Sequence, residues 1–305
     1  MLWDKEFRLG RLFPFLGRLP RAIGYRLATR LGMADARFRR GAMAQELTAV
    51  DAGMARLLPE LAADPQRRAQ AVAAYGALMA RDKVDCFYMP RFEHEGCGNL
   101  IRLAGAEHLA AARDMGRGVI LVISHFGRFF MLGPGLGLNG FPFAMLTTMV
   151  DERNRGYDAV ELAYMKAKMA NTLRYSQGEW VTTADDFRRV FRLLREGRIL
   201  LMAMDGLETN SDQKLQVPFF GGTLQLPAGI VRIAERSGAK LVYAAVRDVA
   251  HDCGVTIGIH PLPDDPAQAL AESVTILERD VRATPWHWWQ WPLLPMMWRA
   301  DPPPT

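Results

Sequence analysis

The residue of this chain best placed to do chemistry is a histidine that follows a strongly apolar segment. Residues 119–124 read Val-Ile-Leu-Val-Ile-Ser, and His125 comes next. A short β-branched run of this kind predicts a buried strand, so His125 is expected at a strand's carboxyl end, where α/β proteins bind their ligands. A neutral imidazole there can remove a proton from an acceptor hydroxyl or amine. A histidine at a strand end is often structural instead, so this pattern alone leaves both roles open.

Strands and helices alternate in the part of the chain that must position His125. Apolar runs predict strands at residues 199–204, 240–247 and 254–260, and residues 185–196 have the periodicity of an amphipathic helix. Residues 35–83 are rich in Ala, Leu, Arg and Glu and read as helical. This alternation predicts an α/β fold, with a central mixed sheet flanked by helices and a helical amino-terminal region packed on it.

The first 34 residues form a basic and apolar segment. Between residues 7 and 34 no acidic residue occurs, and arginines alternate with Leu, Phe, Ile and Tyr. Such a segment suits the surface of an anionic bilayer, although a helical pair docked on the protein's own core, with its arginines in solvent, fits as well. We expect two regions: a membrane-contact segment at residues 1–34 and a single α/β domain at residues 35–305.

The amino-acid composition limits the classes of binding partner that are expected. The formal net charge of +5 favours an anionic partner, and nucleic acid, anionic lipid and phosphorylated or thioester-carrier substrates all fit it. The arginines lie among large aliphatic residues and no nucleic-acid-binding module is recognisable, so nucleic acid is not expected. Three widely spaced cysteines predict a reducing compartment. No secretory signal and no membrane-spanning run is evident, so the protein is expected to be soluble or to lie on a membrane.

The segment around His125 resembles the bacterial lipid A late acyltransferases, within the lysophospholipid acyltransferase-like group. That family carries His-x-x-x-x-Glu/Asp, commonly as His-Phe-Gly-Asn-Trp-Glu, and residues 125–130 read His-Phe-Gly-Arg-Phe-Phe. Downstream, residues 200–205 are similar to the family's strand ending in Asp-Gln, and residues 217–221 to its Val-Pro-Phe-Phe-Gly segment. Residues 286–291 are similar to its tryptophan-containing end. The resemblance covers nearly the whole chain, in order.

The resemblance implies an acyltransferase bound peripherally to the cytoplasmic face of the bacterial inner membrane. It would move a fatty acyl chain from acyl carrier protein or coenzyme A to a hydroxyl or amine of a lipid or glycolipid acceptor. The acyl thioester is then a co-substrate, and neither a further cofactor nor a metal is expected. The implied partners are the carrier or CoA thioester, the acceptor and an anionic membrane surface. Alternatives are the same chemistry on an amine or specialised metabolite, or a non-catalytic protein that binds lipid or carrier.

By the resemblance, His125 is the general base. The family's acidic partner would stand at Phe130, whose side chain cannot accept a hydrogen bond from an imidazole. Asp205 is the best candidate to supply the missing charge because it ends a strand of the same predicted sheet, and Glu152 and Glu208 are poorer ones. Alternatively, the acceptor is easily activated, or catalysis has been lost while binding is retained.

Three further residues are expected to bind substrate. Arg128 stands where the family motif usually has Asn, and its guanidinium could hold a phosphate or carboxylate, or simply lie at the surface. Arg153 and Asn154 correspond approximately to an arginine and an asparagine that contact the acyl-acceptor region in the family. The tryptophans of residues 286–291 fit either a core or a lipid interface.

Overall fold

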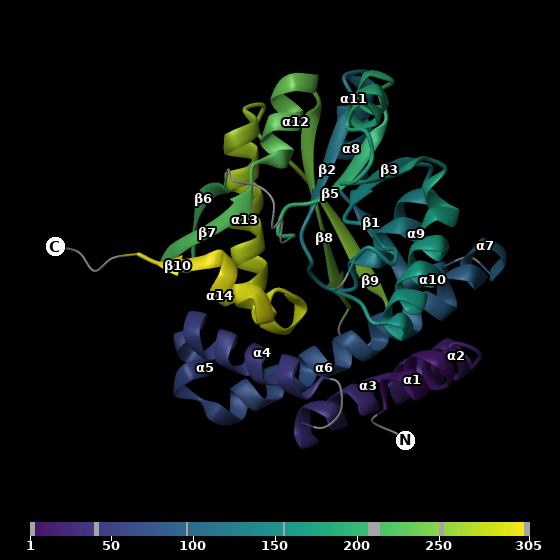
Figure 1. The fold of residues 1–305 in the computed structure, drawn as a ribbon, viewed down its shortest axis with the longest axis vertical. Helices are drawn as coiled ribbons and strands as arrows, with labels where there is room; N and C mark the ends of the chain where they lie inside the picture. The colour runs from purple at the N-terminus through teal and green to yellow at the C-terminus, as the bar shows by residue number, and fades with distance from the viewer. Residues whose placement is uncertain are drawn as a thin grey trace.

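A central mixed sheet organises the protein (Figure 1). The computed structural model describes residues 4–39, 43–95, 97–154, 156–206, 214–249 and 253–301. In these ranges the larger sheet has the strand order β1-β9-β8-β2-β5-β3-β4. Its strands are β1 (Ile101–Ala104), β2 (Val119–Ile123), β3 (Phe143–Thr147), β4 (Trp180–Thr182), β5 (Ile199–Ala203), β8 (Lys240–Asp248) and β9 (Val255–Pro261). The predicted α/β class with a mixed sheet is therefore confirmed.

The strands next to β2 determine what lies beside His125. β2 runs parallel to both β8 and β5, and Ile123 at its carboxyl end is in register with Ala203 of β5. All five residues of β2 are buried, as expected for a central strand covered on both faces. Strands β3 and β4 continue in the same direction, whereas β9 is antiparallel to β8 and β1 pairs parallel with β9. The carboxyl ends of β2 and β5 thus meet at one edge.

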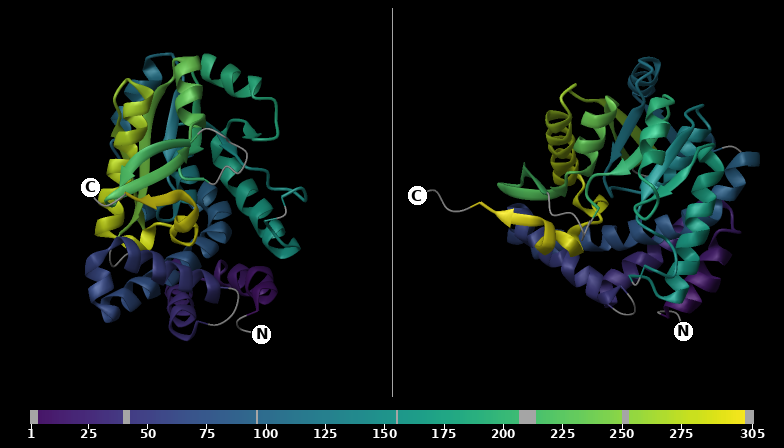
Figure 2. Two further views of the ribbon diagram at one scale, coloured as in Figure 1. Left: turned by 60° about the vertical axis from the view of Figure 1, so that its left-hand side comes forward. Right: turned by 45° about the horizontal axis from the view of Figure 1, so that its top comes forward.

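Helices surround this sheet, and those from the amino-terminal region gather at one end of it (Figure 2). The longest are α3 (Arg21–Phe38), α4 (Ala44–Leu57), α6 (Pro65–Tyr88), α10 (Ala159–Ser176) and α13 (Pro266–Ala283). The shorter ones are α1 (Lys5–Phe7), α2 (Phe13–Leu16), α5 (Pro59–Ala63), α7 (Phe92–Glu95), α8 (Ala106–Asp114), α9 (Leu132–Gly137), α11 (Arg188–Arg195), α12 (Gly229–Ser237) and α14 (Leu294–Met297). None of the helices in the described ranges combines the length and the apolar character needed to cross a bilayer.

The amino-terminal helices pack tightly on one another. α3 lies against α6 through two glycines: a Cβ atom on Gly32 would stand 2.0 Å from the backbone oxygen of Gly76. Only glycine permits this close approach of two backbones. Arg8 forms a buried ion pair with Asp35 of α3 at 2.5 Å. The expected division after residue 34 falls inside α3, and the two-region organisation stays a prediction.

A small second sheet, which the sequence did not predict, carries the Val-Pro-Phe-Phe-Gly segment. Its order is β10-β7-β6, with β6 (Lys214–Phe219), β7 (Gly222–Pro227) and β10 (Trp298–Ala300), all paired antiparallel. β6 is an edge strand, so Pro218, which has no N–H to donate, fits there. Phe220 and Gly221 adopt positive φ angles of 51° and 65° in the tight turn to β7. The segment therefore has a structural role as a hairpin.

Candidate active site

His125 and Asp205 come together at the carboxyl edge of the sheet. Each lies two residues beyond its strand, His125 after β2 and Asp205 after β5. The backbone N–H of Met204 donates to the carbonyl of Ile123 at 2.8 Å, which continues the pairing of the two strands past their ends. The two side chains then face each other, with Nδ1 of His125 2.8 Å from Oδ1 of Asp205. This is the contact expected of a base and the carboxylate that orients it.

The Asp205 carboxylate is fixed by several donors. Its side chain is 0% exposed. Oδ1 also accepts the backbone N–H of His125 at 2.9 Å, and Oδ2 accepts the indole Nε1–H of Trp288 at 3.1 Å. A buried carboxylate needs such partners, because without them its desolvation would be costly. Both carboxylate oxygens are therefore held in one orientation relative to the imidazole.

The hydrogen bonds around His125 decide which ring nitrogen is free. An ionised Asp205 is an acceptor only, so Nδ1 must carry the proton that the 2.8 Å contact requires. Nε2 of Gln290 lies 3.0 Å from the same Nδ1, but it donates to the backbone oxygen of Asp205 at 2.7 Å instead. The lone pair of the imidazole is then on Nε2. The side chain of His125 is 28% exposed, so solvent or a substrate can reach the ring.

The segment that contains Trp288 and Gln290 pairs with the loop after β2. Phe126 and Trp288 form an antiparallel bridge, and the N–H of Trp289 donates to the carbonyl of His125 at 2.9 Å. Gly127 allows this fit: its φ is 64°, and a Cβ there would stand 1.9 Å from the backbone oxygen of Val246. The glycine of the His-Phe-Gly sequence is therefore required by the backbone.

Sequence reasoning missed Trp288 and Gln290 as site residues, although the tryptophan-rich segment was the signal that could have pointed to them. Trp288 and Trp291 are both 0% exposed, so these two indoles belong to the core and not to a lipid interface. Trp289 is only partly buried, and its Nε1–H donates to the carbonyl of Gly127 at 2.8 Å. The segment packs against the histidine loop and fixes it through these hydrogen bonds.

Phe130, at the position of the family's acid, faces a buried lysine. Nζ of Lys168 lies 3.8 Å from the centre of the Phe130 ring and 2.5 Å from Oδ2 of Asp82. The side chain of Lys168 is almost fully buried, so the aromatic face and the carboxylate both stabilise its charge. Phe129 stands between Phe130 and the histidine, with its ring centre 5.0 Å from that of His125. Position 130 is thus part of an aromatic and cationic cluster.

Arg128 is not a surface arginine, and the structure does not bring it to an exposed part of the site. Its side chain is 0% exposed. The guanidinium donates to Asp85 at 2.9 Å and Asp248 at 3.1 Å, and Nη2 donates to the carbonyls of Cys253 and Gly254 at 2.5 and 3.1 Å. The guanidinium carbon lies 5.1 Å from the ring centre of Tyr25. These contacts use the guanidinium to anchor the loop after β2, and they leave the expected substrate contact without geometric support.

The other predicted binding residues lie apart from the dyad in the loop between β3 and α10. Arg153 is 67% exposed on its side chain and pairs with Asp151 at 2.5 Å. Asn154 caps its own loop, donating to the carbonyl of Met149 at 2.8 Å and accepting from the N–H of Gly156 at 3.0 Å. Neither forms a hydrogen bond with His125 or Asp205, and their substrate contacts stay predictions.

The two poorer candidates for the acid do not join His125 in the structure. Glu152 is exposed and forms an ion pair with Lys166 at 2.5 Å. Glu208 lies outside the described residues. Among the residues that are described, no group of His, Cys, Asp or Glu has the arrangement of a metal site. Asp205 is therefore the carboxylate that the described structure brings to the imidazole.

Several buried titratable groups near the loop after β2 have shifted pKa values. Burial raises the pKa of Asp85 to about 6, although Arg128 opposes this shift. Burial also acts to raise the pKa of Asp248, but the nearby Arg128 and Arg81 outweigh it and hold that pKa below its ordinary value. Burial lowers the pKa of His287 to about 4, so this ring is neutral near pH 7. Asp85 and Asp248 both form ion pairs with the buried Arg128 in the loop after β2.

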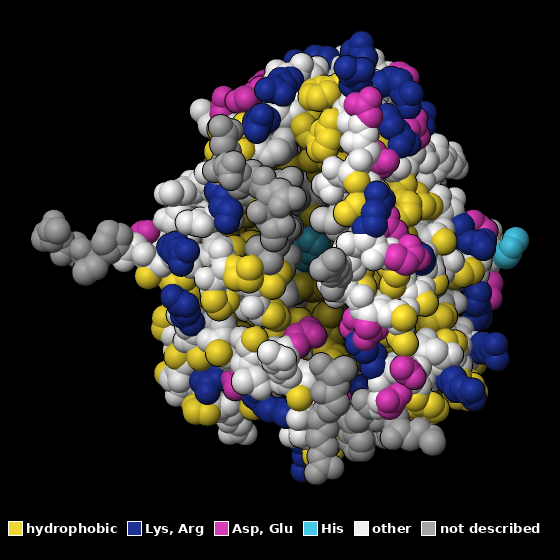
Figure 3. Space-filling model, viewed as in Figure 1, with side chains coloured by type: hydrophobic (Ala, Val, Ile, Leu, Met, Phe, Trp, Pro, Cys, Tyr) yellow, Lys and Arg dark blue, Asp and Glu magenta, His cyan; other side chains and the backbone are white. Residues whose placement is uncertain are grey.

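The surface above this edge of the sheet is hollowed (Figure 3). The picture shows a recess near the centre of the face, with a histidine side chain inside it and hydrophobic side chains above and below the histidine. An apolar recess beside a histidine suits a hydrocarbon chain, since each buried methylene is worth about 0.8 kcal/mol.

Comparison with known proteins gives the family. The model of the family described as bacterial lipid A biosynthesis acyltransferase matches residues 11–294. The chain belongs to this family. Among curated proteins, a phosphatidylinositol mannoside acyltransferase from Mycolicibacterium smegmatis is 30% identical over 166 residues. That alignment covers 54% of this chain and 52% of the relative, so the match spans about half the length of each. The resemblance of the motif segments to the lipid A acyltransferase family is thereby confirmed.

Proposed function

We infer that this protein transfers a fatty acyl chain from a thioester to a hydroxyl or amine of a lipid or glycolipid acceptor. The observation that carries the proposal is the contact between His125 Nδ1 and Asp205 Oδ1 at 2.8 Å, in a chain that belongs to an acyltransferase family. The partly exposed imidazole supplies a base, and the buried carboxylate supplies the partner that the family motif would otherwise provide at Phe130.

In the proposed reaction, Nε2 of His125 takes the proton of the acceptor as the acceptor oxygen or nitrogen attacks the thioester carbonyl. A new bond to the acyl carbon forms and the carbon–sulfur bond then breaks. The imidazolium returns the proton to the departing thiolate. Asp205 stabilises the imidazolium that forms between these steps and keeps the Nδ1–H tautomer. Every proton is accounted for by one histidine, so no further cofactor is needed.

The two substrates follow from different observations. A glycolipid acceptor is favoured by the relative named as a phosphatidylinositol mannoside acyltransferase. The donor is proposed to be acyl carrier protein or coenzyme A carrying the acyl chain, because a thioester is the activated acyl group that a single base can use. We propose that the exposed Arg153, whose Nε and Nη2 donate to Asp151, also contacts an anionic group of either substrate.

We propose that the protein lies on the cytoplasmic face of the bacterial inner membrane as a peripheral protein. In the amino-terminal helices, Phe15, Ile23 and Met33 are about half exposed. Arg11, Arg18, Arg26 and Arg30 are exposed among them, and no acidic residue occurs between residues 7 and 34. Exposed apolar side chains interleaved with arginines fit an anionic bilayer surface.

The test is acyl transfer by the purified full chain. Radiolabelled acyl carrier protein and acyl-CoA would be offered with a panel of dispersed lipid and glycolipid acceptors, using wild type and His125→Ala. Transfer by wild type that His125→Ala loses supports the proposal, whereas equal transfer by both removes His125 as the base. If no acceptor is acylated but a lipid co-purifies with the chain in mass spectra, the non-catalytic binding alternative is favoured.

A further inference from the structure

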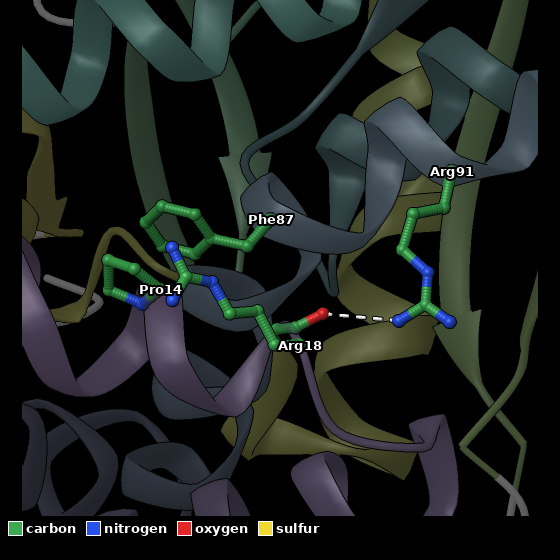
Figure 4. Close-up of a pocket in the computed structure, with 5 residues that line it drawn as sticks. Pro14, Arg18, Phe87 and Arg91 are labelled. Carbon is green, nitrogen blue, oxygen red and sulfur yellow. Dashed lines mark hydrogen bonds between the residues drawn. The ribbon is translucent and has the colours of Figure 1, made fainter.

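A pocket lies on the amino-terminal helices (Figure 4). It has a volume of about 430 Å³ and is lined by Pro14, Gly17, Arg18, Phe87 and Arg91. None of these residues forms a hydrogen bond with His125 or Asp205. We call it the Arg18 pocket. Two of its residues are cationic and two present apolar rings.

The floor of the Arg18 pocket is built closely. A Cβ on Gly17 would stand 2.3 Å from Cβ of Phe87, so the turn after α2 lies directly on α6. Nη1 of Arg91 donates to the carbonyl of Gly17 at 3.2 Å, the bond drawn in Figure 4, and its Nε pairs with Glu95 at 2.8 Å. Arg91 thus holds the turn in place while its charge is shared with Glu95.

Arg18 is the distinctive member. Within the part of the chain that the structure describes, its guanidinium makes no hydrogen bond and no ion pair, and its side chain is exposed. Figure 4 shows it extending along Pro14 and Phe87. An arginine that rests on apolar rings and keeps all its donors free is arranged to bind an oxyanion, because the planar fork matches the geometry of phosphate.

We propose that the Arg18 pocket binds the phosphate group of an anionic membrane lipid. The apolar rings of Pro14 and Phe87 would contact the glycerol and upper acyl region while the guanidinium of Arg18, which lies beside both rings in Figure 4, binds the phosphate. Phe15, the neighbour of Pro14 and 55% exposed, would enter the acyl region beside it. The proposal rests on the membrane placement given above and adds to it a specific headgroup site on that face.

The experiment compares vesicle binding by variants that remove the same charge at two places. Full-length protein would be sedimented with phosphatidylcholine vesicles that contain or lack phosphatidylglycerol. Arg26, also exposed and without an ion pair among the described residues, is the matched control outside the pocket. We expect Arg18→Gln to weaken binding to the anionic vesicles by about tenfold or more, and Arg26→Gln by no more than about fivefold.

Charge-conserving variants distinguish specific phosphate binding in the pocket from non-specific electrostatic attraction to the membrane. Arg18→Lys keeps the charge but loses the planar fork, so it should weaken binding several-fold, whereas Arg26→Lys should bind as wild type does. Equal losses of vesicle binding in Arg18→Gln and Arg26→Gln, with both lysine variants binding as wild type does, would overturn the proposal that the Arg18 pocket binds phosphate. The proposal that the protein lies on the membrane would not be affected. Failure of wild type to bind anionic vesicles would overturn both, and neither result bears on acyl transfer, which His125→Ala tests separately.

The last measurement identifies the source of the phosphate. Calorimetric titration with glycerol 3-phosphate asks whether the pocket binds the group without its lipid. Weak or absent binding, together with Arg18-dependent binding of vesicles, supports a lipid ligand, since the apolar walls then contribute. Saturable, Arg18-dependent binding of glycerol 3-phosphate with no preference for anionic vesicles would overturn the lipid assignment.

Discussion

Oδ1 of Asp205 lies 2.8 Å from Nδ1 of His125, although 80 positions separate the two residues in the chain. The contact exists because β2 and β5 are parallel neighbours and both residues stand two positions beyond their strands. A carboxylate from the adjacent strand is therefore positioned to do what an acid within the His-x-x-x-x-Glu/Asp motif would do.

The first prediction is that Asp205→Asn lowers kcat by about 10²–10⁴-fold with a small change in KM. The amide can no longer stabilise the imidazolium or specify the Nδ1–H tautomer. Steady-state kinetics of acyl transfer would measure this. Asp114→Asn, at an exposed position, is the control and should retain activity. Unchanged turnover in Asp205→Asn would rule out the substitute-acid role.

A second prediction concerns Trp288, whose Nε1–H donates to Oδ2 of Asp205 at 3.1 Å. Trp288→Phe removes this donor and should lower kcat by about tenfold, because the carboxylate loses a charge-assisted hydrogen bond worth about 1.5–3 kcal/mol. Trp291→Phe is a matched control: its Nε1–H donates to the carbonyl of Pro285 at 2.8 Å, and it is equally buried. Both should lose stability in urea titrations. A similar fall in kcat for both variants would assign Trp288 to packing alone.

For Arg128, we expect a loss of stability and not a selective loss of substrate affinity. Arg128→Met leaves Asp85 and Asp248 buried without their shared cation, which should lower the free energy of unfolding by about 3–5 kcal/mol. Arg153→Gln, at an exposed position, should change it by no more than about 0.5 kcal/mol. Denaturant titration measures both. A raised KM in Arg128→Met with unchanged stability would instead restore the substrate-binding role.

Restoring the family's acid should not improve the enzyme. In Phe130→Glu the new carboxylate is expected to pair with Lys168, whose Nζ lies 3.8 Å from the centre of the present ring, because Phe129 stands between position 130 and His125. Turnover should therefore not rise above wild type, and Phe130→Leu serves as the control for loss of the ring. A gain of about tenfold or more in Phe130→Glu would show that the acid can reach the imidazole.

His287 should contribute a loss of stability in mild acid. Its pKa is lowered to about 4 in the folded protein, against 6.5 for an unperturbed histidine, so the unfolded chain binds more protons between these values. Each tenfold difference in proton affinity between the folded and unfolded chain corresponds to about 1.4 kcal/mol. About 3 kcal/mol of stability is therefore present above pH 6.5 and is lost as the pH falls toward 4.

The comparison with His287→Gln isolates this effect. Asp85, with a raised pKa of about 6, titrates in the same range but with the opposite sign, because its folded form holds a proton more tightly than the unfolded form does. Between pH 7 and pH 4, the urea midpoint of wild type should decrease relative to that of His287→Gln. Parallel curves for the two proteins would contradict the assignment.

Much of the framework could be predicted because central parallel strands are continuous apolar runs. The runs at residues 119–124 and 199–204 correspond to β2 and β5, to within one or two residues at their ends. The proximity of Asp205 to His125 followed from placing both at strand ends of one sheet. That β5 is the immediate neighbour of β2 depends on long-range topology, which local patterns do not encode.

The remaining site features could not be predicted because they depend on contacts between distant segments. From the sequence, Arg128 is expected to be an exposed loop residue. Its burial is possible because Asp85 and Asp248, from other elements, neutralise its charge. The role of Trp288 likewise requires the bridge between Phe126 and Trp288, which joins segments far apart in sequence. Short strands such as β1 and β4 lack the long apolar run that identified their neighbours.

Tyr25 on α3 donates its hydroxyl to Asp85 on α6 at 2.5 Å, and the same carboxylate oxygen accepts from Arg128 in the loop after β2. Helix α3, helix α6 and the loop after β2 are thus joined by hydrogen bonds to one buried carboxylate. A shortened chain starting at residue 35 would deprive Asp85 of its phenol and Arg128 of the aromatic face beside it. Chimeras between relatives would therefore have to exchange the first helices and the histidine loop as a matched set.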